Sequence, residues 1–398
     1  MTFPQARETV LQRVGEAVAA PRAETVDILC AAGRVLAQDI AADRDTPPTS
    51  RSVRDGFAIR SADTAGESEG EFEVVGESRA GASFAGTVGP HQAVEIMTGA
   101  AVPDGADAVV MVEHVERRGE RIVVTGGVAP GQFINPKACE AAKGELVLRA
   151  GMRLDYTGVA MLAAFGFSRV PVFAKPTVAI LATGDEIVAL DKTPKDFQIR
   201  NSNAYSLAAQ VIRAGGTPKL LPIARDTFDD TAEMIELGLR CDLLLLSGGV
   251  SAGKYDVVEP VLAECGAEFF FDRVLIQPGQ PVVFGRAQER FFFGLPGNPS
   301  STMVTFEIFA RAALELLSGQ REISLHMPWA RLTHEFRHRA GITRFLPAKL
   351  STDGGEITPV PWQGSGDIPS MTRANAYLVA LPDRPIYEAG DWIQTLLK

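Results

Sequence analysis

The sequence predicts an α/β protein of several domains, in which a doubly wound sheet stands between β-rich parts. The chain has 398 residues, and at roughly 150 residues per domain this length allows two to four domains. Residues 177–318 alternate apolar strand-like runs with helical runs, a pattern typical of a parallel sheet covered on both faces. Residues 52–144 and 323–398 instead show short strand-like runs between glycine and proline turns, which indicates two smaller β domains.

Composition and charge exclude several classes of protein. Apolar residues make up 46% and charged residues 22% of the chain, which is ordinary for a soluble globular protein. The net charge of −10 argues against a general nucleic-acid binder, which needs a basic face. No apolar run approaches the roughly 18–20 residues of a membrane span, and the first residues lack the apolar core of a signal peptide. The four cysteines form no CxxC pair, so we expect a reducing cytoplasm rather than a disulfide framework.

The N-terminal part is expected to be helical at first and then β-rich. Apolar residues at helical spacing predict a helix over 6–18 and a shorter one over 27–37. Two prolines within 45–50 then interrupt regular structure. A strand, a helix over 157–165 and a turn at Pro171 are expected further on. The β-rich stretch between them carries strand-like runs at 72–75, 93–97, 108–112 and 122–124.

The central stretch alternates strands and helices along its whole length. Its strands are predicted at 177–181, 219–223, 242–246, 282–284 and 291–294. Its helices are predicted at 202–213, 229–239, 257–264 and 299–317. The residues from 323 to the end are predicted to form a second small β domain of barrel-like form.

Polar, turn-forming clusters follow the strands of this predicted sheet. In a doubly wound sheet the ligand lies outside the carboxyl ends of the strands. Glycines there let backbone N–H groups converge on an oxyanion, and a helix that opens at Asn298 or Ser300 adds free N–H groups and a positive dipole end. The clusters, which together predict a phosphorylated ligand such as a nucleotide, lie at 183–186, 225–226, 247–251, 277–281 and 295–300.

Carboxylates stand beside these glycine loops. Oxygen ligands of this kind suit a Mg²⁺ ion that bridges phosphates. The alternative interpretation is that the glycines, asparagines and serines are only turn and cap residues. Several such clusters at one sheet edge favour the ligand site. The carboxylates concerned are Asp185, Glu186, Asp226 and Asp256.

Two local motifs point to other chemistry. Gly248, Gly253 and Lys254 have the spacing of a P-loop, but Tyr255 stands where Ser or Thr would hold Mg²⁺. Residues 334–338 match the H-E-x-x-H zinc motif, which requires a helix, whereas this stretch is strand-like. We therefore expect neither a P-loop NTPase nor a zinc protease, and interpret 334–338 as a solvated strand or turn.

Six multi-residue motifs follow one another in order along nearly the whole chain. They are SVRDGFA at 52–58, IMTGA at 96–100, TGDE at 183–186, SGGVSxGxxD at 247–256, PGxP at 278–281 and LPGNPxS at 295–301. In this combination the chain resembles the molybdopterin molybdenumtransferase family, that is MoeA and the related C-terminal (E) domain of gephyrin.

The resemblance implies a subunit of four parts. They are an N-terminal and linker domain (1–45 with 145–174), an inserted β-rich domain (46–144), a molybdopterin-binding α/β domain (175–320) and a C-terminal β-barrel-like domain (321–398). It also implies a homodimer, with the site between the α/β domain of one subunit and the inserted domain of the other. The implied reaction inserts molybdate into adenylylated molybdopterin and releases AMP with the help of Mg²⁺. Molybdopterin adenylyltransferase is a further implied partner.

By motif match, the resemblance implies three sets of site residues. The catalytic carboxylates are Asp55, Glu140, Glu186, Asp226 and Asp256. The Mg²⁺ ligands among them are Glu186, Asp226 and Asp256. The residues that bind pterin and nucleotide are Thr98, Thr183, Gly184, Asp185, Ser247, Gly248, Gly249, Ser251, Gly253, Pro278, Gly279, Pro296, Gly297, Asn298, Ser300 and Arg344.

Two stretches depart from the family pattern. Where the family has lysines in its oxyanion loop, this chain has Gln277 and Gln280, which can donate hydrogen bonds but bring no charge. We expect Arg344, Lys254 or Arg273 to compensate. In the inserted domain the family's arginine-rich stretch with an acidic pair is replaced by 135–140, where only Glu140 keeps an acidic role.

These departures keep alternatives open. The oxyanion is molybdate or tungstate. Instead of a transferase, the chain could be a catalytically weak paralogue that carries molybdopterin or acts as a scaffold for other cofactor-assembly proteins. A third alternative is a hydrolase that cleaves the adenylylated pterin without inserting the metal.

Overall fold

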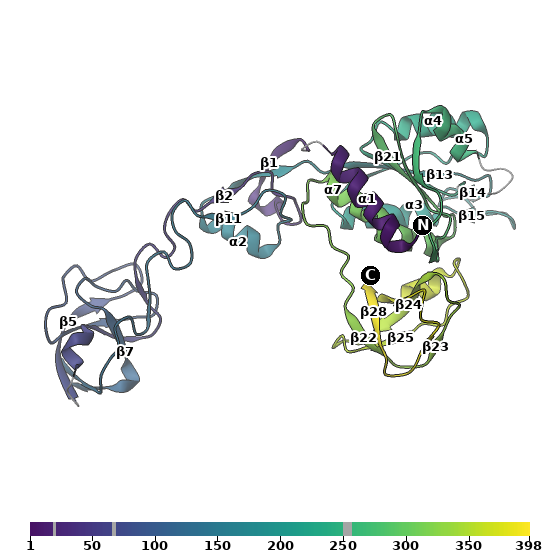
Figure 1. Cartoon of the computed structure of the whole chain (residues 1–398). Helices are drawn as coiled ribbons and strands as arrows, with labels where there is room; N and C mark the ends of the chain where they lie inside the picture. Colours follow the sequence, from purple (N-terminus) through teal and green to yellow (C-terminus); the bar gives the residue numbers. More distant parts are fainter. Residues whose placement is uncertain (19–20, 66–68, 250–256) are drawn as a thin grey trace. The chain divides into compact units, whose positions relative to one another are not determined.

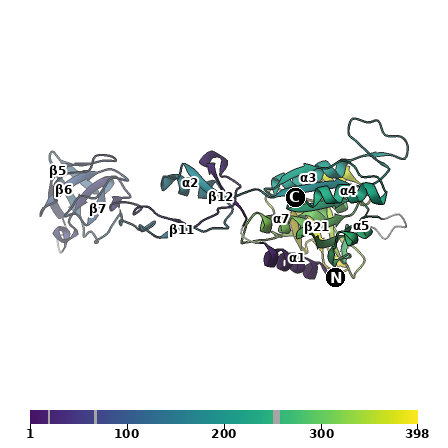
Figure 2. The same ribbon diagram turned by 90° about the horizontal axis from the view of Figure 1, so that it is seen from above.

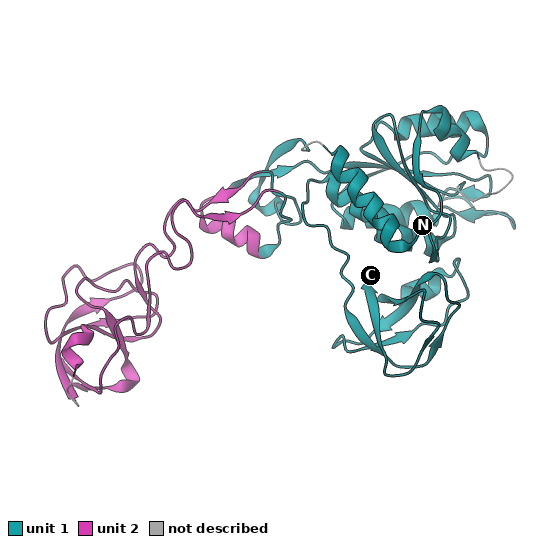
Figure 3. Cartoon of the chain, viewed as in Figure 1, with its two compact units in different colours: residues 1–37, 151–156, 169–398 teal, residues 38–150, 157–168 magenta. Residues whose placement is uncertain are grey.

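The computed structural model describes residues 1–18, 21–65, 69–249 and 257–398. The chain divides into two compact units, which Figure 3 shows in different colours. The first unit holds residues 1–37, 151–156 and 169–398, and the second holds 38–150 and 157–168. Among the described residues, no helix combines the length and the apolar character that crossing a membrane requires.

A six-stranded mixed sheet forms the centre of the first unit (Figure 1). In order across the sheet the strands are β16 (Thr217–Leu220), β13 (Thr177–Ala182), β17 (Leu243–Ser247), β21 (Arg290–Leu295), β20 (Val283–Ala287) and β18 (Glu268–Phe271). The first four strands are parallel, as the alternating pattern predicts. The sheet departs from the predicted parallel arrangement at one edge, because β20 runs antiparallel to both β21 and β18.

The antiparallel strand arises from a tight hairpin between β20 and β21. Ala287 pairs with Arg290, so only Gln288 and Glu289 form the turn. Both turn residues have positive φ, at 46° and 64°, which is the backbone of a type I′ turn. This turn type matches the twist of antiparallel strands, so it reverses the chain in two residues.

Helices cover both faces of this sheet, as Figures 1 and 2 show. Alternate strand residues point to opposite faces: Val178 and Ile180 pack with the helices at 3–17, 202–213 and 299–317, whereas Ala179 and Leu181 pack with those at 228–238 and 258–264. The helices are α1 (Phe3–Ala17), α3 (Ser202–Arg213), α4 (Phe228–Gly238), α5 (Val258–Glu264), and α6 (Pro299–Thr305), which continues through a π-helical turn (Phe306–Ala310) into α7 (Arg311–Leu317).

Two small strand pairs complete the α/β part of this unit. β14 (Ile187–Val188) and β15 (Ile199–Arg200) pair in parallel beside the sheet. β1 (Ala23–Asp27) pairs with β12 (Arg169–Phe173) in an antiparallel ribbon. Two sequence expectations fail at this ribbon. Pro171 is a strand residue opposite Thr25 rather than a turn, and 27–37 holds only a 3₁₀ turn (Ile28–Cys30) before Gly33 adopts a φ of +75°. A non-helical glycine so soon after the turn prevents the expected helix from extending.

The C-terminal part closes into a barrel, as the sequence predicts. Its strands are β24 (Thr343–Leu350), β25 (Glu356–Pro359), β22 (Trp329–Leu332), β28 (Trp392–Leu397) and β26 (Ala376–Ala380), and β26 pairs back with β24. A sixth strand, β19 (Ile276–Gln277), comes from the α/β part and pairs in parallel with β24. α8 (Ile368–Arg373) precedes β26.

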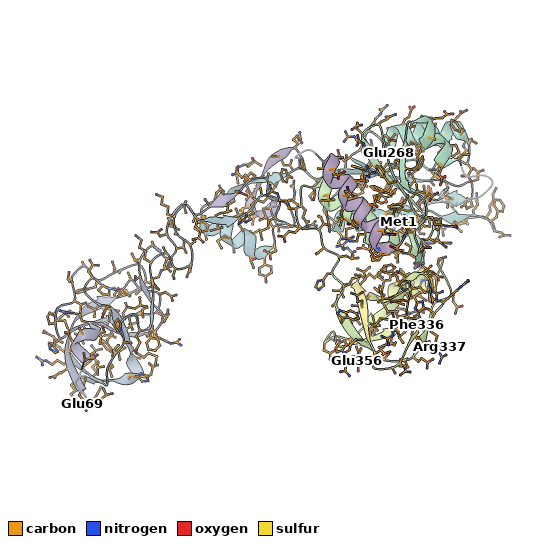
Figure 4. All side chains as sticks on the ribbon, in the orientation of Figure 1. Met1, Glu69, Glu268, Phe336, Arg337 and Glu356 are labelled. Carbon is orange, nitrogen blue, oxygen red and sulfur yellow. The ribbon has the colours of Figure 1, made fainter. Side chains whose placement is uncertain are left out.

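Residues 334–338 lie on the surface of this barrel and contain no helix. β23 (Phe336–Arg337) pairs with β27 (Ile386–Tyr387), and Figure 4 labels both residues of β23. His334 is exposed and bonds the Thr333 hydroxyl, whereas His338 is buried, stacks on Phe336 and contacts the Arg384 carbonyl at 2.7 Å. The strand is as expected, but burial of His338 is not.

The second unit is built on its own six-stranded sheet. The order is β7 (Ala108–Met111), β4 (Gly56–Ile59), β6 (Gln92–Ile96), β5 (Glu69–Ser78), β9 (Arg121–Thr125) and β8 (Val115–Arg118). Phe57, Phe72 and Ile122 fill its core. Two short pairs extend from it, β3 (Arg51–Ser52) with β10 (Ile134–Asn135), and β2 (Ile40–Ala41) with β11 (Leu146–Leu148). The helix expected at 157–165 is α2 (Tyr156–Ala164).

Candidate functional site

A cleft of about 480 Å³ lies at the carboxyl ends of β13, β17 and β21. The three strands end level with one another, because Ala182 pairs with Ser247 and Ser247 pairs with Leu295. The loops that follow therefore begin at one height and share one space. The predicted site residues that line the cleft are Thr183, Gly184, Glu186, Asp226, Ser247, Gly248, Gly249, Pro296, Gly297 and Asn298.

The loops after β13, β17 and β21 approach so closely that only glycine fits at one position. Gly248 has a φ of +96°, and a Cβ added to it would lie 2.8 Å from the Thr183 carbonyl oxygen. A Cβ on Gly297 would lie 3.6 Å from the Gly248 Cα, which is ordinary contact. The Gly248 N–H donates to the Leu295 carbonyl at 3.2 Å. The glycines therefore bring three backbone segments together at the floor of the cleft.

Two carboxylates line the same cleft. Glu186 and Asp226 are both exposed to it, and Asp226 is tied to Asp185 by reciprocal bonds. The Asp185 N–H donates to Asp226 Oδ2 at 3.3 Å, and the Asp226 N–H donates to Asp185 Oδ1 at 3.4 Å. Across the described ranges, no three histidine, cysteine or acidic side chains are grouped to hold a metal. The third predicted metal ligand, Asp256, lies outside these ranges, as do Ser251, Gly253 and Lys254.

Asn203 is a cleft residue that the sequence motifs do not indicate. Its Nδ2 donates to Ser247 Oγ and to the Gly297 carbonyl, at 2.8 Å each. Asn203 is the second residue of α3, and its neighbour Asn201 caps that helix by accepting the Ala204 N–H. In the sequence, two asparagines at the start of a helix both look like capping residues. The fold shows that Asn203 instead contacts the two glycine loops.

The β14–β15 pair supplies another unpredicted wall. Ile187, Ile199 and Arg200 line the cleft there. The Arg200 Nε donates to the carbonyls of Leu190 and Lys192, at 3.2 and 3.1 Å, which anchors this side chain at the cleft. This wall therefore adds the apolar surface of two isoleucines and one positive charge.

Ser300 has a different surrounding from the one that the sequence predicts. The residue is fully buried, and both its N–H and its hydroxyl donate to the Ser365 carbonyl, at 3.0 and 2.8 Å. Ser365 belongs to the C-terminal part of the chain. The two donors that were expected to meet a phosphate thus join the start of α6 to the barrel domain.

The predicted oxyanion loop, 277–281, is held between the barrel and α6. Gln277 pairs with Arg344 across β19 and β24. The Arg344 Nε is buried and has no hydrogen-bond partner among the described residues, and burial lowers the pKa of this guanidinium. Gly279 has a φ of +100°, and a Cβ there would lie 2.4 Å from the Thr305 methyl group. Pro281 of this loop lines the cleft, whereas Pro278, Gly279 and Arg344 do not.

The second unit brings two predicted residues together. Thr98 donates its N–H and its hydroxyl to Asp55 Oδ1, at 2.6 and 2.8 Å. The backbone N–H first and the hydroxyl second lower the pKa of the Asp55 carboxyl below its usual value. Glu140 is exposed in the same unit, where its N–H donates to the Thr46 carbonyl.

Comparison with known proteins adds to this geometry. Three family models match in order: the MoeA N-terminal region, domains I and II, at residues 1–166, the probable molybdopterin binding domain at 179–316, and the MoeA C-terminal region, domain IV, at 329–398. Among curated proteins, the molybdopterin molybdenumtransferase of Bacillus subtilis (strain 168) is 37% identical over 92% of this chain and 87% of its own length. That of Staphylococcus aureus (strain Mu50 / ATCC 700699) is 31% identical over 97% and 94%.

A solved structure covers the whole fold. The crystal structure of the molybdopterin biosynthesis moeA protein from Pyrococcus horikoshii OT3 is 30% identical, covers 100% of both chains and has a TM-score of 0.84. The identity, the coverage and the order of the three matched regions agree with the motifs at the cleft. The chain belongs to the molybdopterin molybdenumtransferase (MoeA) family.

Proposed function

We propose that this protein acts in molybdenum cofactor biosynthesis, where it inserts molybdate into adenylylated molybdopterin and releases AMP. The observation that carries the proposal is the single cleft in which the glycine loops after β17 and β21 face two carboxylates, Glu186 and Asp226. Glycine loops offer backbone N–H groups to phosphate oxygens, and carboxylates suit a divalent cation. The names of the relatives support this assignment.

The donor set of the cleft fits Mg²⁺. This ion keeps several waters and usually takes only one or two carboxylates together with substrate phosphates. Glu186 and Asp226 both line the cleft and would provide two carboxylate ligands, and Asp256 is a candidate third. When bound, the ion would neutralise phosphate charge and polarise the anhydride that links AMP to the pterin.

The residues of the chain would then bind and orient the reactants. The backbone at Gly248, Gly249 and Gly297 would hold the phosphates, and Thr183 and Ser247 stand at the base of the same loops. Water cleaves the anhydride: its oxygen bonds to one phosphorus atom as the bridging P–O bond breaks, which releases AMP and leaves molybdopterin with its terminal phosphate. One molybdate oxygen leaves as water with the two protons of the dithiol, as both dithiolene sulfurs bind the metal. Anhydride cleavage supplies the driving force for this exchange.

Arg344 would supply the charge that the oxyanion loop lacks. Gln277 and Gln280 are neutral donors, whereas Arg344 stands in register with Gln277 and has an unused buried Nε. A guanidinium is a strong, permanently charged partner for an oxyanion. The neighbouring strand therefore offers the positive charge at the position where the loop has lost it.

The Asp55–Thr98 pair and Glu140 would complete the site from the inserted domain of a second subunit, which makes the active form a homodimer. We place this dimer in the cytoplasm, where the four cysteines, all free in the structure, remain reduced. Molybdopterin adenylyltransferase would supply the adenylylated substrate.

One incubation separates the candidate functions. The purified chain is mixed with adenylylated molybdopterin, Mg²⁺ and molybdate, and both AMP and active cofactor are followed. The transferase produces both. AMP without active cofactor would indicate the hydrolase, and no AMP would indicate a carrier, the candidate that the neutral Gln277 and Gln280 favour. Replacing molybdate by tungstate in the same assay identifies the oxyanion.

A further inference from the structure

Asn203 makes an unusual pair of contacts at the floor of the cleft. One side-chain nitrogen, Nδ2, donates to Ser247 Oγ after β17 and to the Gly297 carbonyl after β21, each at 2.8 Å. A carbonyl oxygen can only accept a hydrogen bond, so the contact with Gly297 fixes which end of the amide faces the loops. The amide therefore bridges the two glycine loops from a third element, α3.

The same amide has an oxygen without a donor. Asn203 Oδ1 is buried and has no hydrogen-bond partner among the described residues. A buried acceptor without a donor costs stability, so such a group in a native protein calls for an explanation. Among the described residues, the amide is held by its nitrogen alone.

We infer that Asn203 is a positioning residue, which holds the loops after β17 and β21 at the spacing that the phosphates of the substrate require. The two loops are also joined by backbone, through the Gly248 N–H that donates to the Leu295 carbonyl at 3.2 Å, and the Asn203 amide adds a side-chain bridge to this contact. By accepting from Asn203, the Ser247 oxygen is also oriented so that its own O–H is left to donate elsewhere. Asn203 acts through these loops and not through contact with the reacting atoms. The inference rests on the proposed function for its substrate, but not for the bridge itself.

Gln210 provides a matched control on the same helix. Its Nε2 also donates twice, to the Met303 carbonyl at 3.0 Å and to Glu307 Oε1 at 2.8 Å, and its Oε1 is also buried without a partner. Unlike Asn203, Gln210 does not line the cleft. Each amide is replaced by an apolar side chain of similar size. Asn203→Leu removes the bridge at the cleft, and Gln210→Met removes a bridge of the same kind away from the cleft.

The test compares amide hydrogen exchange in the ligand-free full-length protein with binding of adenylylated molybdopterin. In Asn203→Leu we expect exchange at 247–249 and 297–298 to rise about tenfold and the affinity to fall about tenfold, while Gln210→Met leaves both within twofold. Equal effects in the two variants, or unchanged exchange at both loops in Asn203→Leu, would overturn the inference. Faster exchange without weaker binding would also overturn it. If the wild-type protein releases no AMP, the proposed reaction fails, whereas the exchange result still decides the bridge.

Discussion

Thr98 directs two donors, its backbone N–H and its hydroxyl, at one oxygen of Asp55, over 2.6 and 2.8 Å. Both bonds favour the ionised carboxylate and lower the pKa of Asp55. The pair is exposed, so the bonds are made in contact with water and do not bury the charge. Because of these two bonds, the Asp55 carboxylate stays ionised to lower pH than an ordinary aspartate.

Thr98 should set the pH at which activity falls on the acid side, through its bonds to Asp55. Thr98→Val removes the hydroxyl donor but keeps the N–H, so the pKa of Asp55 should rise toward its usual value. Since activity is expected to need the carboxylate, the acid limb of the pH profile of kcat/KM should move to higher pH. The control is Thr125→Val, which changes an exposed threonine at the end of β9 in the same unit and should not move the acid limb. An acid limb at the wild-type position in Thr98→Val would exclude Asp55 as the group that titrates.

Gly248 and Gly297 should differ in what an added methyl group does. Gly248→Ala places a Cβ 2.8 Å from a backbone oxygen at a φ of +96°, so it should lower the free energy of unfolding by about 1–3 kcal/mol. Gly297→Ala meets only ordinary contact at 3.6 Å and should leave that free energy nearly unchanged. Urea unfolding of the two variants checks the difference, and equal losses would show that the close approach at Gly248 is relaxed.

Ser300 should matter for stability more than for binding. Ser300→Ala removes the hydroxyl bond to the Ser365 carbonyl and should cost about 1 kcal/mol of unfolding free energy. Since both donors of Ser300 already face the barrel domain, the affinity for adenylylated molybdopterin should stay within twofold of the wild type. A large loss of affinity with unchanged stability would instead place Ser300 at the ligand.

Arg344 should dominate the affinity for the oxyanion. Arg344→Gln removes the partly buried charge beside Gln277 and should weaken molybdate binding about tenfold in calorimetric titration. Gln280→Lys should strengthen it, because it returns a charge to the loop. Arg331→Gln, on the exposed face of the same barrel, is the control. Equal affinity in all four proteins would place the oxyanion elsewhere.

Metal dependence should follow from the two cleft carboxylates. Chelation by EDTA should abolish AMP release, and added Mg²⁺ should restore it. Glu186→Gln and Asp226→Asn should each raise the Mg²⁺ concentration needed for half-maximal rate about tenfold, since each removes one charged ligand. Asp229→Asn, in the first turn of α4, should behave as the wild type. Metal-independent release would contradict the account.

Much of the fold could be read from local pattern. The helix at 202–213 coincides with α3, because Asn201 caps it and glycines follow it. The hairpin of β20 and β21 could not be foreseen, because Gln288 and Glu289 lack the glycine or asparagine that usually marks a type I′ turn. The segment 27–37 has helical spacing, yet Val35 and Leu36 form bridges to distant residues instead.

In the site, too, features set by neighbouring residues could be predicted, whereas contacts between residues far apart in sequence could not. The glycine loops were predictable because glycine clusters after strands have a physical meaning wherever they occur. The roles of Asn203 and Ser300 depend on Gly297 and Ser365, which lie 94 and 65 residues away in sequence. No local pattern encodes such contacts, so a helix-start polar residue looks the same whether it bridges two loops or faces water.

The most direct test of the central claim is the molar ratio of AMP released to active cofactor formed in one reaction of the pure protein. The substrates are adenylylated molybdopterin, Mg²⁺ and molybdate. We expect a ratio of one, with both products dependent on Mg²⁺. AMP in large excess over active cofactor, or active cofactor formed without AMP, would contradict it.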